Sequence, residues 1–204
     1  MEKHVTFPVG DITLEGLVSL PTAAAIGAVV CHPHPLYGGE MLNNVVSALV
    51  KGFGKAGIAT LRFNFRGVGR SGGRHDDGNA EQDDVKAAVS YLLSRQSFET
   101  VVVAGYSFGS MVGLKAGADD ARVHKLIGVA LPIARRDASF LEGVAKPKLL
   151  ISGDCDDISP ASQMQRLVDM LAEPRRLVLV PGADHFFGGM EQRVVEAAVR
   201  FLTE

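Results

Sequence analysis

The stretch that decides the fold is VVVAGYSFG, residues 101–109, in which a short apolar run leads directly into the pattern G-x-S-x-G. The run Val101–Ala104 is rich in β-branched residues and uncharged, as expected of a parallel strand buried on both faces. A segment compatible with a helix, SMVGLKA, follows. Gly105 and Gly109 remove side chains where strand and helix approach each other, so Ser107 is predicted to lie on a sharp turn as a candidate nucleophile.

A second match to G-x-S-x-G, at residues 69–73, lacks this context. Ser71 lies several residues beyond the nearest apolar run and precedes GGRHDDGN, a segment of turn composition. We therefore interpret Ser71 as a loop residue. The overlapping G-x-G-x-x-G at residues 67–72 resembles a dinucleotide-binding pattern, but no helix opens within its glycines and the next strand does not end in an acidic residue.

The composition is that of an ordinary globular protein. The chain has 204 residues, of which 47% are hydrophobic, so one domain spanning residues 1–204 is expected. A net charge of −2 provides no basic field for nucleic acid or anionic lipid. The arginine pairs Arg135-Arg136 and Arg175-Arg176 are therefore expected to be solvated rather than functional.

The sequence indicates a cytoplasmic protein. The N-terminus has no apolar signal region, and no segment approaches the roughly 18 apolar residues that a membrane span needs. Two cysteines, Cys31 and Cys155, are too few for a disulfide framework and fit a reducing compartment. We expect Cys31 to pack in the core and the two not to pair.

Strands and helices alternate along the chain. Two strands joined by Gly10-Asp11 are predicted as an antiparallel hairpin, and six buried strands follow it. The predicted strands are Val5–Val9, Ile12–Leu20, Ala28–Cys31, Thr60–Phe65, Val101–Tyr106, Leu126–Leu131, Leu149–Ser152 and Leu177–Val180. Apolar residues at helical spacing lie between the later strands, and Ser159-Pro160 reads as a helix N-cap with a first-turn proline. The pattern predicts a mixed, mostly parallel sheet with helices on both faces and an active site beyond the carboxyl ends of the strands.

A serine nucleophile requires a base, and the base requires an acid that orients it. His185, in PGADHFFGG, follows the last strand and lies at the same sheet edge as Ser107. The segment GDCDDISP offers Asp154, Asp156 and Asp157 after the preceding strand.

Metal chemistry is the alternative for these residues. The aspartate cluster has no histidine or glutamate at ligand spacing. The pair His32-x-His34, in CHPHPLYGG, shares the sheet edge but has no further ligands in view. We therefore predict neither a metal nor another cofactor.

The order Ser107, Asp156, His185, each after its own strand, resembles the α/β-hydrolase fold, whose triad runs Ser, Asp, His along the chain. Residues 63–71, FNFRGVGRS, are similar to the R-G-x-G-x-S loop of that family, and GDCDDISP is similar to its G-x-x-D-x-x-x-P acid loop. This resemblance selects Asp156 among the three aspartates. CHPHPLYGG is similar to a loop of small bacterial hydrolases related to dienelactone hydrolases, which use a cysteine where this chain has Ser107.

The resemblance implies an oxyanion hole built from backbone N–H groups of Phe108 and of the loop after the third strand. Pro33 and Pro35 have no N–H group, so His34 is the expected second donor, with Leu36 as the alternative. Members of the family commonly carry a cap domain after the sixth strand. Here only about 15 residues separate Leu131-Pro132, near the end of that strand, from Lys146-Pro147 before the next one, so no cap domain is expected.

An uncapped site predicts an open pocket, which suits an uncharged, partly apolar acyl group. Its expected walls are Leu36, Tyr37, Phe108, Ile133, Phe186 and Phe187. We expect a serine hydrolase of carboxylesterase type that acts on a small-molecule acyl substrate, with His185 as general base and acid. Esters, thioesters, lactones and small amides share the tetrahedral intermediate of such a site. The alternative is a non-catalytic small-molecule-binding protein on a hydrolase scaffold.

Overall fold

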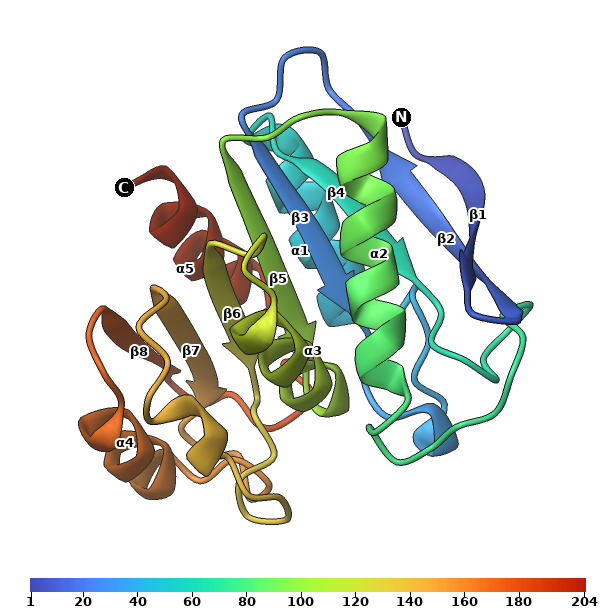
Figure 1. The fold of residues 1–204 in the computed structure, drawn as a ribbon. Helices are drawn as coiled ribbons and strands as arrows, with labels where there is room; N and C mark the ends of the chain where they lie inside the picture. Colours follow the sequence, from blue (N-terminus) through green and yellow to red (C-terminus); the bar gives the residue numbers. More distant parts are fainter.

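The computed structural model describes residues 1–204 and contains one sheet of eight strands in the order β1-β2-β4-β3-β5-β6-β7-β8 (Figure 1). The strands are β1 (Lys3–Val9), β2 (Ile12–Ser19), β3 (Ile26–Cys31), β4 (Ala59–Phe63), β5 (Thr100–Tyr106), β6 (Lys125–Val129), β7 (Lys148–Gly153) and β8 (Arg175–Val180). The helices are α1 (Asn44–Lys55), α2 (Glu81–Arg95), α3 (Phe108–Asp119), α4 (Ala161–Met170) and α5 (Glu191–Thr203). Two short 3₁₀ turns are η1 (Pro35–Tyr37) and η2 (Ser139–Leu141).

The sheet is mostly parallel, as the sequence predicts. Strands β3 to β8 run parallel to one another, whereas β1 pairs antiparallel with β2, and β2 antiparallel with β4. All eight predicted strands are present, with ends that differ from the prediction by no more than two residues. The hairpin turns at Gly10, whose φ of +53° is readily adopted by glycine.

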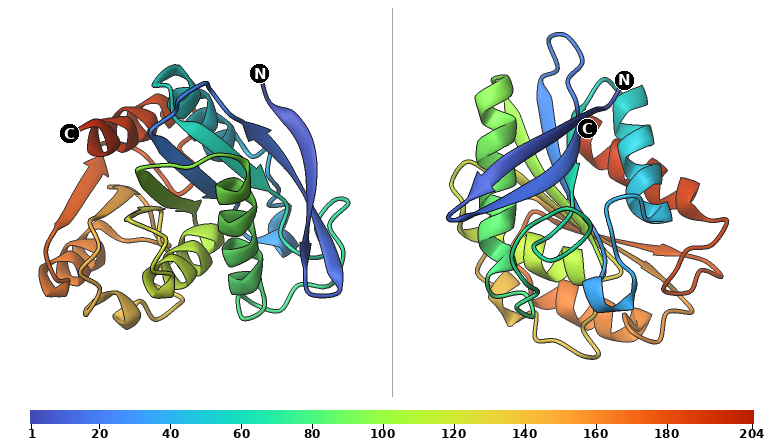
Figure 2. Two further views of the ribbon diagram at one scale, coloured as in Figure 1. Left: turned by 45° about the horizontal axis from the view of Figure 1, so that its top comes forward. Right: turned by 90° about the vertical axis from the view of Figure 1, so that its right-hand side faces the viewer.

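Helices cover both faces of the sheet. Helices α2, α3 and α4 pack on one face and α1 and α5 on the other (Figure 2). Successive residues of β5 show the two-residue period of a strand that feeds two cores. Val101 and Val103 belong to the core under α2 and α3, while Val102 and Ala104 belong to the core under α1 and α5.

The predicted N-cap of α4 is wrong. The helix begins at Ala161 with Pro160 in the N-cap position and no side-chain cap. The Ser159 hydroxyl is buried without a hydrogen-bond partner. Its backbone N–H donates to Oδ1 of Asp156 over 2.8 Å, so Ser159 belongs to the loop that holds the acid rather than to the helix.

The carboxyl ends of the parallel strands are left uncapped. Only the short turn η2 lies between β6 and β7, so no cap domain covers the end of β5. None of the five helices combines the length and apolar character that a membrane crossing requires. Both cysteines are free, Cys31 is fully buried, and their regions lie three strand positions apart, at β3 and just after β7.

Glycines permit the close crossing from β5 to α3. A Cβ atom added to Gly105 would lie 2.1 Å from the carbonyl oxygen of Gly109. A Cβ atom added to Gly109 would lie 2.3 Å from the carbonyl oxygen of His32 and 2.5 Å from that of Cys31. The first turn of α3 therefore packs directly on the main chain at the end of β3.

Replacing Gly109 by alanine is expected to lower the free energy of unfolding by about 3 kcal/mol, because main-chain oxygens must move to admit the new methyl group. The control is Gly54→Ala in α1, where an added Cβ meets nothing within 4 Å. That change is expected to raise the free energy of unfolding by up to about 1 kcal/mol. Urea unfolding followed by circular dichroism measures both effects, and equal responses of the two variants would contradict the proposed packing constraint.

Candidate active site

Ser107 occupies the turn between β5 and α3 in a strained conformation, with φ +53° and ψ −119°. Such a backbone conformation costs a non-glycine residue of order 1–3 kcal/mol and persists where surrounding contacts enforce it. Here the Ser107 N–H donates to the carbonyl of Val129 over 2.8 Å. The Ser107 carbonyl in turn accepts from the Ser110 hydroxyl over 2.6 Å. The turn thus holds the Ser107 hydroxyl at the carboxyl end of the sheet.

The Ser107 hydroxyl, His185 and Asp156 form one hydrogen-bonded chain. Oγ of Ser107 lies 2.9 Å from Nε2 of His185, and Nδ1 of His185 lies 2.8 Å from Oδ2 of Asp156. A carboxylate beside Nδ1 keeps the proton on that nitrogen and leaves Nε2 with a free lone pair. In this arrangement His185 is oriented to accept the proton of Ser107.

The Asp156 carboxylate is buried but well satisfied. Its Oδ1 accepts the N–H groups of Ile158 and Ser159, both over 2.8 Å. Burial works to raise the pKa of Asp156, but the hydrogen bonds from His185 and from these two N–H groups outweigh it and hold the pKa below its usual value. Asp156 therefore stays ionised near neutral pH.

The two other candidate aspartates lie elsewhere. Asp154 is exposed and accepts the N–H of Gly182 over 2.7 Å, so it ties the loops after β7 and β8 together. Asp157 is exposed and makes no hydrogen bond with the chain. Only Asp156 is brought to His185.

Tyr106 is a site residue that the sequence analysis missed. Its hydroxyl donates to the backbone carbonyl of His185 over 2.9 Å in a buried position. The nucleophile's immediate neighbour therefore anchors the loop that carries the histidine. Its place next to Ser107 was the available signal, but a pairing across 79 positions of sequence depends on the order of the strands.

The backbone N–H groups of Phe108 and His34, which line the same pocket as Ser107, have no partner in the protein. The N–H group of Leu36, the alternative donor, already has a partner, since it donates to Nδ1 of His34 over 3.2 Å. Of the two candidates in the loop after β3, only His34 keeps a free N–H. Phe108 opens α3, where the first N–H groups of a helix carry partial positive charge.

His32 is structural and supports the same loop. It is fully buried, with Nδ1 2.7 Å from the carbonyl of Pro33, and Nε2 accepts the N–H of Phe65 over 3.0 Å. Burial lowers the pKa of His32 to about 4, although the hydrogen bond to Pro33 works in the opposite direction. The neutral ring therefore ties the loop after β3 to the loop after β4. Ser71 has a similar role, since its buried hydroxyl donates to the carbonyl of Asn64 over 2.7 Å.

Ser107 and His185 lie on the wall of a pocket of about 660 Å³. Of the residues expected to line it, Tyr37, Phe108 and Phe186 do so. A larger hollow of about 960 Å³ between β8 and α5 contains no serine, cysteine or histidine, so it offers none of this chemistry.

Three expected wall residues are placed differently. Leu36 is 72% exposed and is not among the residues that line the pocket, and Ile133 lines a neighbouring hollow near α4. Phe187 is fully buried in the core under α1 and α5, because its φ of +53° turns it away from the direction taken by Phe186. The sequence alone does not reveal such a local reversal of the chain.

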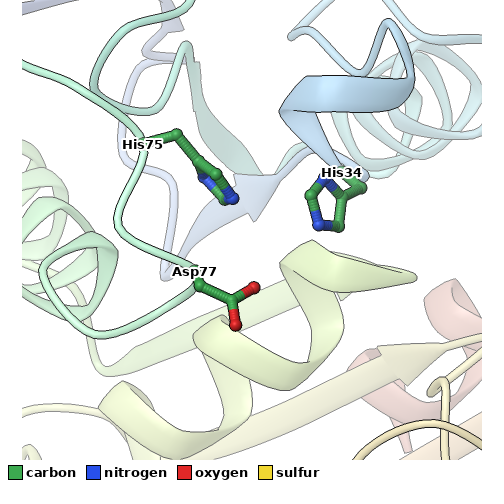
Figure 3. A group of neighbouring side chains, drawn as sticks. All are labelled: His34, His75 and Asp77. Carbon is green, nitrogen blue, oxygen red and sulfur yellow. The ribbon is translucent and has the colours of Figure 1, made fainter.

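The side chains of His34, His75 and Asp77 gather at the edge of the pocket, with potential ligand atoms within 4.8 Å of one another (Figure 3). The group fits a metal ion poorly. Asp77 is paired with Arg136, which already supplies a positive charge. Nδ1 of His34 accepts a hydrogen bond, so the other nitrogen of the neutral ring carries the proton and has no lone pair for a metal. The pair His32-x-His34 is also unsuitable because both nitrogens of His32 are engaged.

Known proteins share this arrangement of strands and helices. The family model for the alpha/beta hydrolase fold matches residues 29–142, which include Ser107 but neither Asp156 nor His185. The structure of an alpha-beta serine hydrolase homologue from Coxiella burnetii is 36% identical with a TM-score of 0.90, covering 98% of this chain and 97% of that one. An α/β serine hydrolase without a lid from Xanthomonas campestris is 33% identical with a TM-score of 0.88, covering 99% and 94%. An uncharacterized protein of Rickettsia prowazekii is 34% identical over an alignment 169 residues long, which covers 78% of this chain and 71% of that protein.

The buried, neutral His32 predicts a loss of stability in acid. A histidine in the unfolded chain takes up a proton near pH 6.5, whereas folded His32 does so only near pH 4. Between these two pH values the unfolded state therefore binds more protons than the folded state. The free energy of unfolding consequently decreases as the pH falls. The free energy of unfolding is expected to fall by about 2 kcal/mol between pH 7 and pH 5 from this residue.

Urea unfolding at the two pH values measures this loss. The variant His32→Gln is expected to be less stable at pH 7 but to lose less stability on acidification. The control His4→Gln, on the exposed surface of β1, is expected to keep most of the wild-type loss. An equal loss in wild type and His32→Gln would contradict the assignment.

Proposed function

The chain belongs to the alpha/beta hydrolase fold family, and on this premise we propose that it is a serine hydrolase of carboxylesterase type that cleaves small carboxylic esters. One observation carries the proposal. The Ser107 hydroxyl, His185 and Asp156 form an unbroken hydrogen-bonded chain whose nucleophile end lies on an open pocket. The pocket size suits a small acyl group and its alcohol.

In the proposed reaction the ester carbonyl carbon is attacked by Oγ of Ser107 while Nε2 of His185 takes the hydroxyl proton. The carbonyl oxygen becomes an oxyanion, to which the free N–H groups of Phe108 and His34 donate. His185 then returns its proton to the leaving alcohol, and an acyl-enzyme remains on Ser107. Water attacks this acyl group with His185 acting again as base, which releases the carboxylic acid and restores the hydroxyl.

The residues around the site stabilise each charge that develops during the proposed reaction. Asp156 is ionised in the free protein, so it stabilises the imidazolium that forms on His185 in both steps. Each oxyanion donor contributes about 10²–10³-fold in kcat in enzymes where one has been removed. The positive end of α3 adds to the effect at Phe108.

Esters are favoured over the other candidate substrates because they need the least assistance from the protein in expelling the leaving group. Thioesters, lactones and small amides pass through the same intermediate and remain secondary candidates. A non-catalytic binding protein does not need an aligned serine, histidine and aspartate together with two free N–H donors. That combination favours catalysis over binding alone.

Treatment with a fluorophosphonate is expected to label Ser107 and no other residue, because only its hydroxyl is activated by a histidine. Ser71 serves as an internal control, since its hydroxyl is committed to the Asn64 carbonyl. Mass spectrometry of the digested protein locates the adduct. Labelling that survives in Ser107→Ala, or that occurs on Ser71, would refute the assignment of the nucleophile.

Substitution of Asp156 by asparagine is expected to reduce kcat on 4-nitrophenyl esters by about 10³–10⁴-fold, because the amide no longer holds the required tautomer of His185. The matched control is Asp157→Asn, one residue away and exposed without a hydrogen bond. That variant is expected to keep kcat within about twofold. A comparable loss of kcat in folded Asp157→Asn protein would contradict the assignment of Asp156 as the residue that orients His185.

A further inference from the structure

The lining of the pocket is not uniformly apolar. Tyr37 and Phe186 contribute exposed aromatic surface, with 81% and 65% of each residue exposed. The segment after β6 contributes Pro132, Arg135 and Arg136 to the same lining as Ser107. We call Arg135 and Arg136 together the arginine pair.

Arg136 is held in a fixed position at the pocket. Its guanidinium pairs with the carboxylate of Asp77 and also donates to the Asp77 carbonyl over 3.2 Å. The same guanidinium lies 5.7 Å from the centre of the Phe108 ring. These contacts fix one guanidinium beside the residue that follows the nucleophile, so little side-chain freedom remains to be lost when a ligand binds.

Arg135, by contrast, has no counter-ion. The residue is exposed, and its guanidinium makes neither a hydrogen bond nor an ion pair with the chain. A free guanidinium presents several donors in a planar fork that matches a carboxylate. The pair therefore combines one positioned cation with one unpaired cation.

Among the residues that line the pocket, positive charges outnumber negative ones. The arginine pair contributes two positive charges, and Asp77 is the only acidic residue in the lining. His34 adds no charge near neutral pH, because burial, then His75 and Arg136, lower its pKa. The protein as a whole carries a net charge of −2, so the excess of arginines is a local feature of the lining. The ionised Asp156 lies behind His185, outside the lining, and its carboxylate is already met by His185 and two backbone N–H groups.

We propose that the arginine pair recognises a carboxylate on the substrate, so that the preferred esters carry a negative charge. This inference rests on the proposed function and deepens it. It also changes the expectation from sequence, in which the arginines were solvated and the substrate uncharged. Arg135 binds the carboxylate directly, while Arg136, partly neutralised by Asp77, adds to the local field.

Two matched substrate pairs test the proposal. Mono-4-nitrophenyl glutarate against 4-nitrophenyl pentanoate places the carboxylate on the acyl side. The pair 4-carboxyphenyl butyrate and 4-carbamoylphenyl butyrate places it on the alcohol side. The measured quantity is the ratio of kcat/KM for the charged ester to that for its neutral partner. The ratio is expected to exceed the ratio of uncatalysed hydrolysis rates in at least one pair, and failure in both pairs would overturn the proposal.

In the pair that shows the preference, Arg135→Gln is expected to lower the ratio about tenfold, mainly through KM. Asp77→Asn is expected to raise it, because the substitution removes the only negative charge from the lining. Asparagine tolerates the φ of +51° at this position. The control Arg193→Gln removes an exposed arginine of α5 outside the pocket and is expected to leave the ratio within twofold. An unchanged ratio in Arg135→Gln, or a lower ratio in folded Asp77→Asn, would overturn the proposal.

A binding measurement separates this inference from the proposed function. Glutarate itself is the probe, and isothermal titration compares wild type, Ser107→Ala and Arg135→Gln. Wild type and Ser107→Ala are expected to bind glutarate, and Arg135→Gln is expected to bind it about tenfold more weakly. If no ester is hydrolysed but glutarate binds in this pattern, the proposed function fails and the anion site stands. If esters are hydrolysed but Arg135→Gln binds glutarate as tightly as wild type does, the anion site fails alone.

Discussion

The close approach of the first turn of α3 to the end of β3 is the constraint on which the rest of the site depends. Gly109 lies against the main-chain oxygens of His32 and Cys31, so the two free N–H groups, on Phe108 and His34, come from segments in direct contact. The same contact leaves Ser107 at the crest of the turn with a strained backbone. Buried His32 extends this constraint to the loop after β4, because its Nε2 accepts the N–H group of Phe65.

Much of this arrangement could be predicted from local sequence. Short apolar runs identified every strand, and the order of Ser107, Asp156 and His185 identified the family pattern. What the sequence did not reveal depends on contacts between distant segments or on local backbone reversals. The pairing of Tyr106 with the His185 carbonyl requires the strand order, the buried position of Phe187 follows from one positive φ, and Arg136 finds its partner in a loop 59 positions away.

Two groups of charged side chains lie at the pocket or directly behind it, and they differ in whether each charge has a partner. The Asp156 carboxylate is buried, and its two oxygens accept hydrogen bonds from His185 and from the main chain. A satisfied network of this kind gives rigidity, since any displacement would leave a buried charge unpaired. Around Arg136 the groups are more exposed, and one positive charge remains without a partner. The first group is suited to holding a geometry and the second to meeting a ligand from solution.

The short connection between β6 and β7 has a consequence for how the protein selects its substrates. Enzymes with a mobile lid assemble their site around the correct ligand, and the motion itself contributes to discrimination and often limits turnover. Only η2 lies between β6 and β7, so no lid domain covers the end of β5. Discrimination between substrates must then depend on the residues that line the pocket, because they are in place before the substrate binds. No later closure adds to that selection.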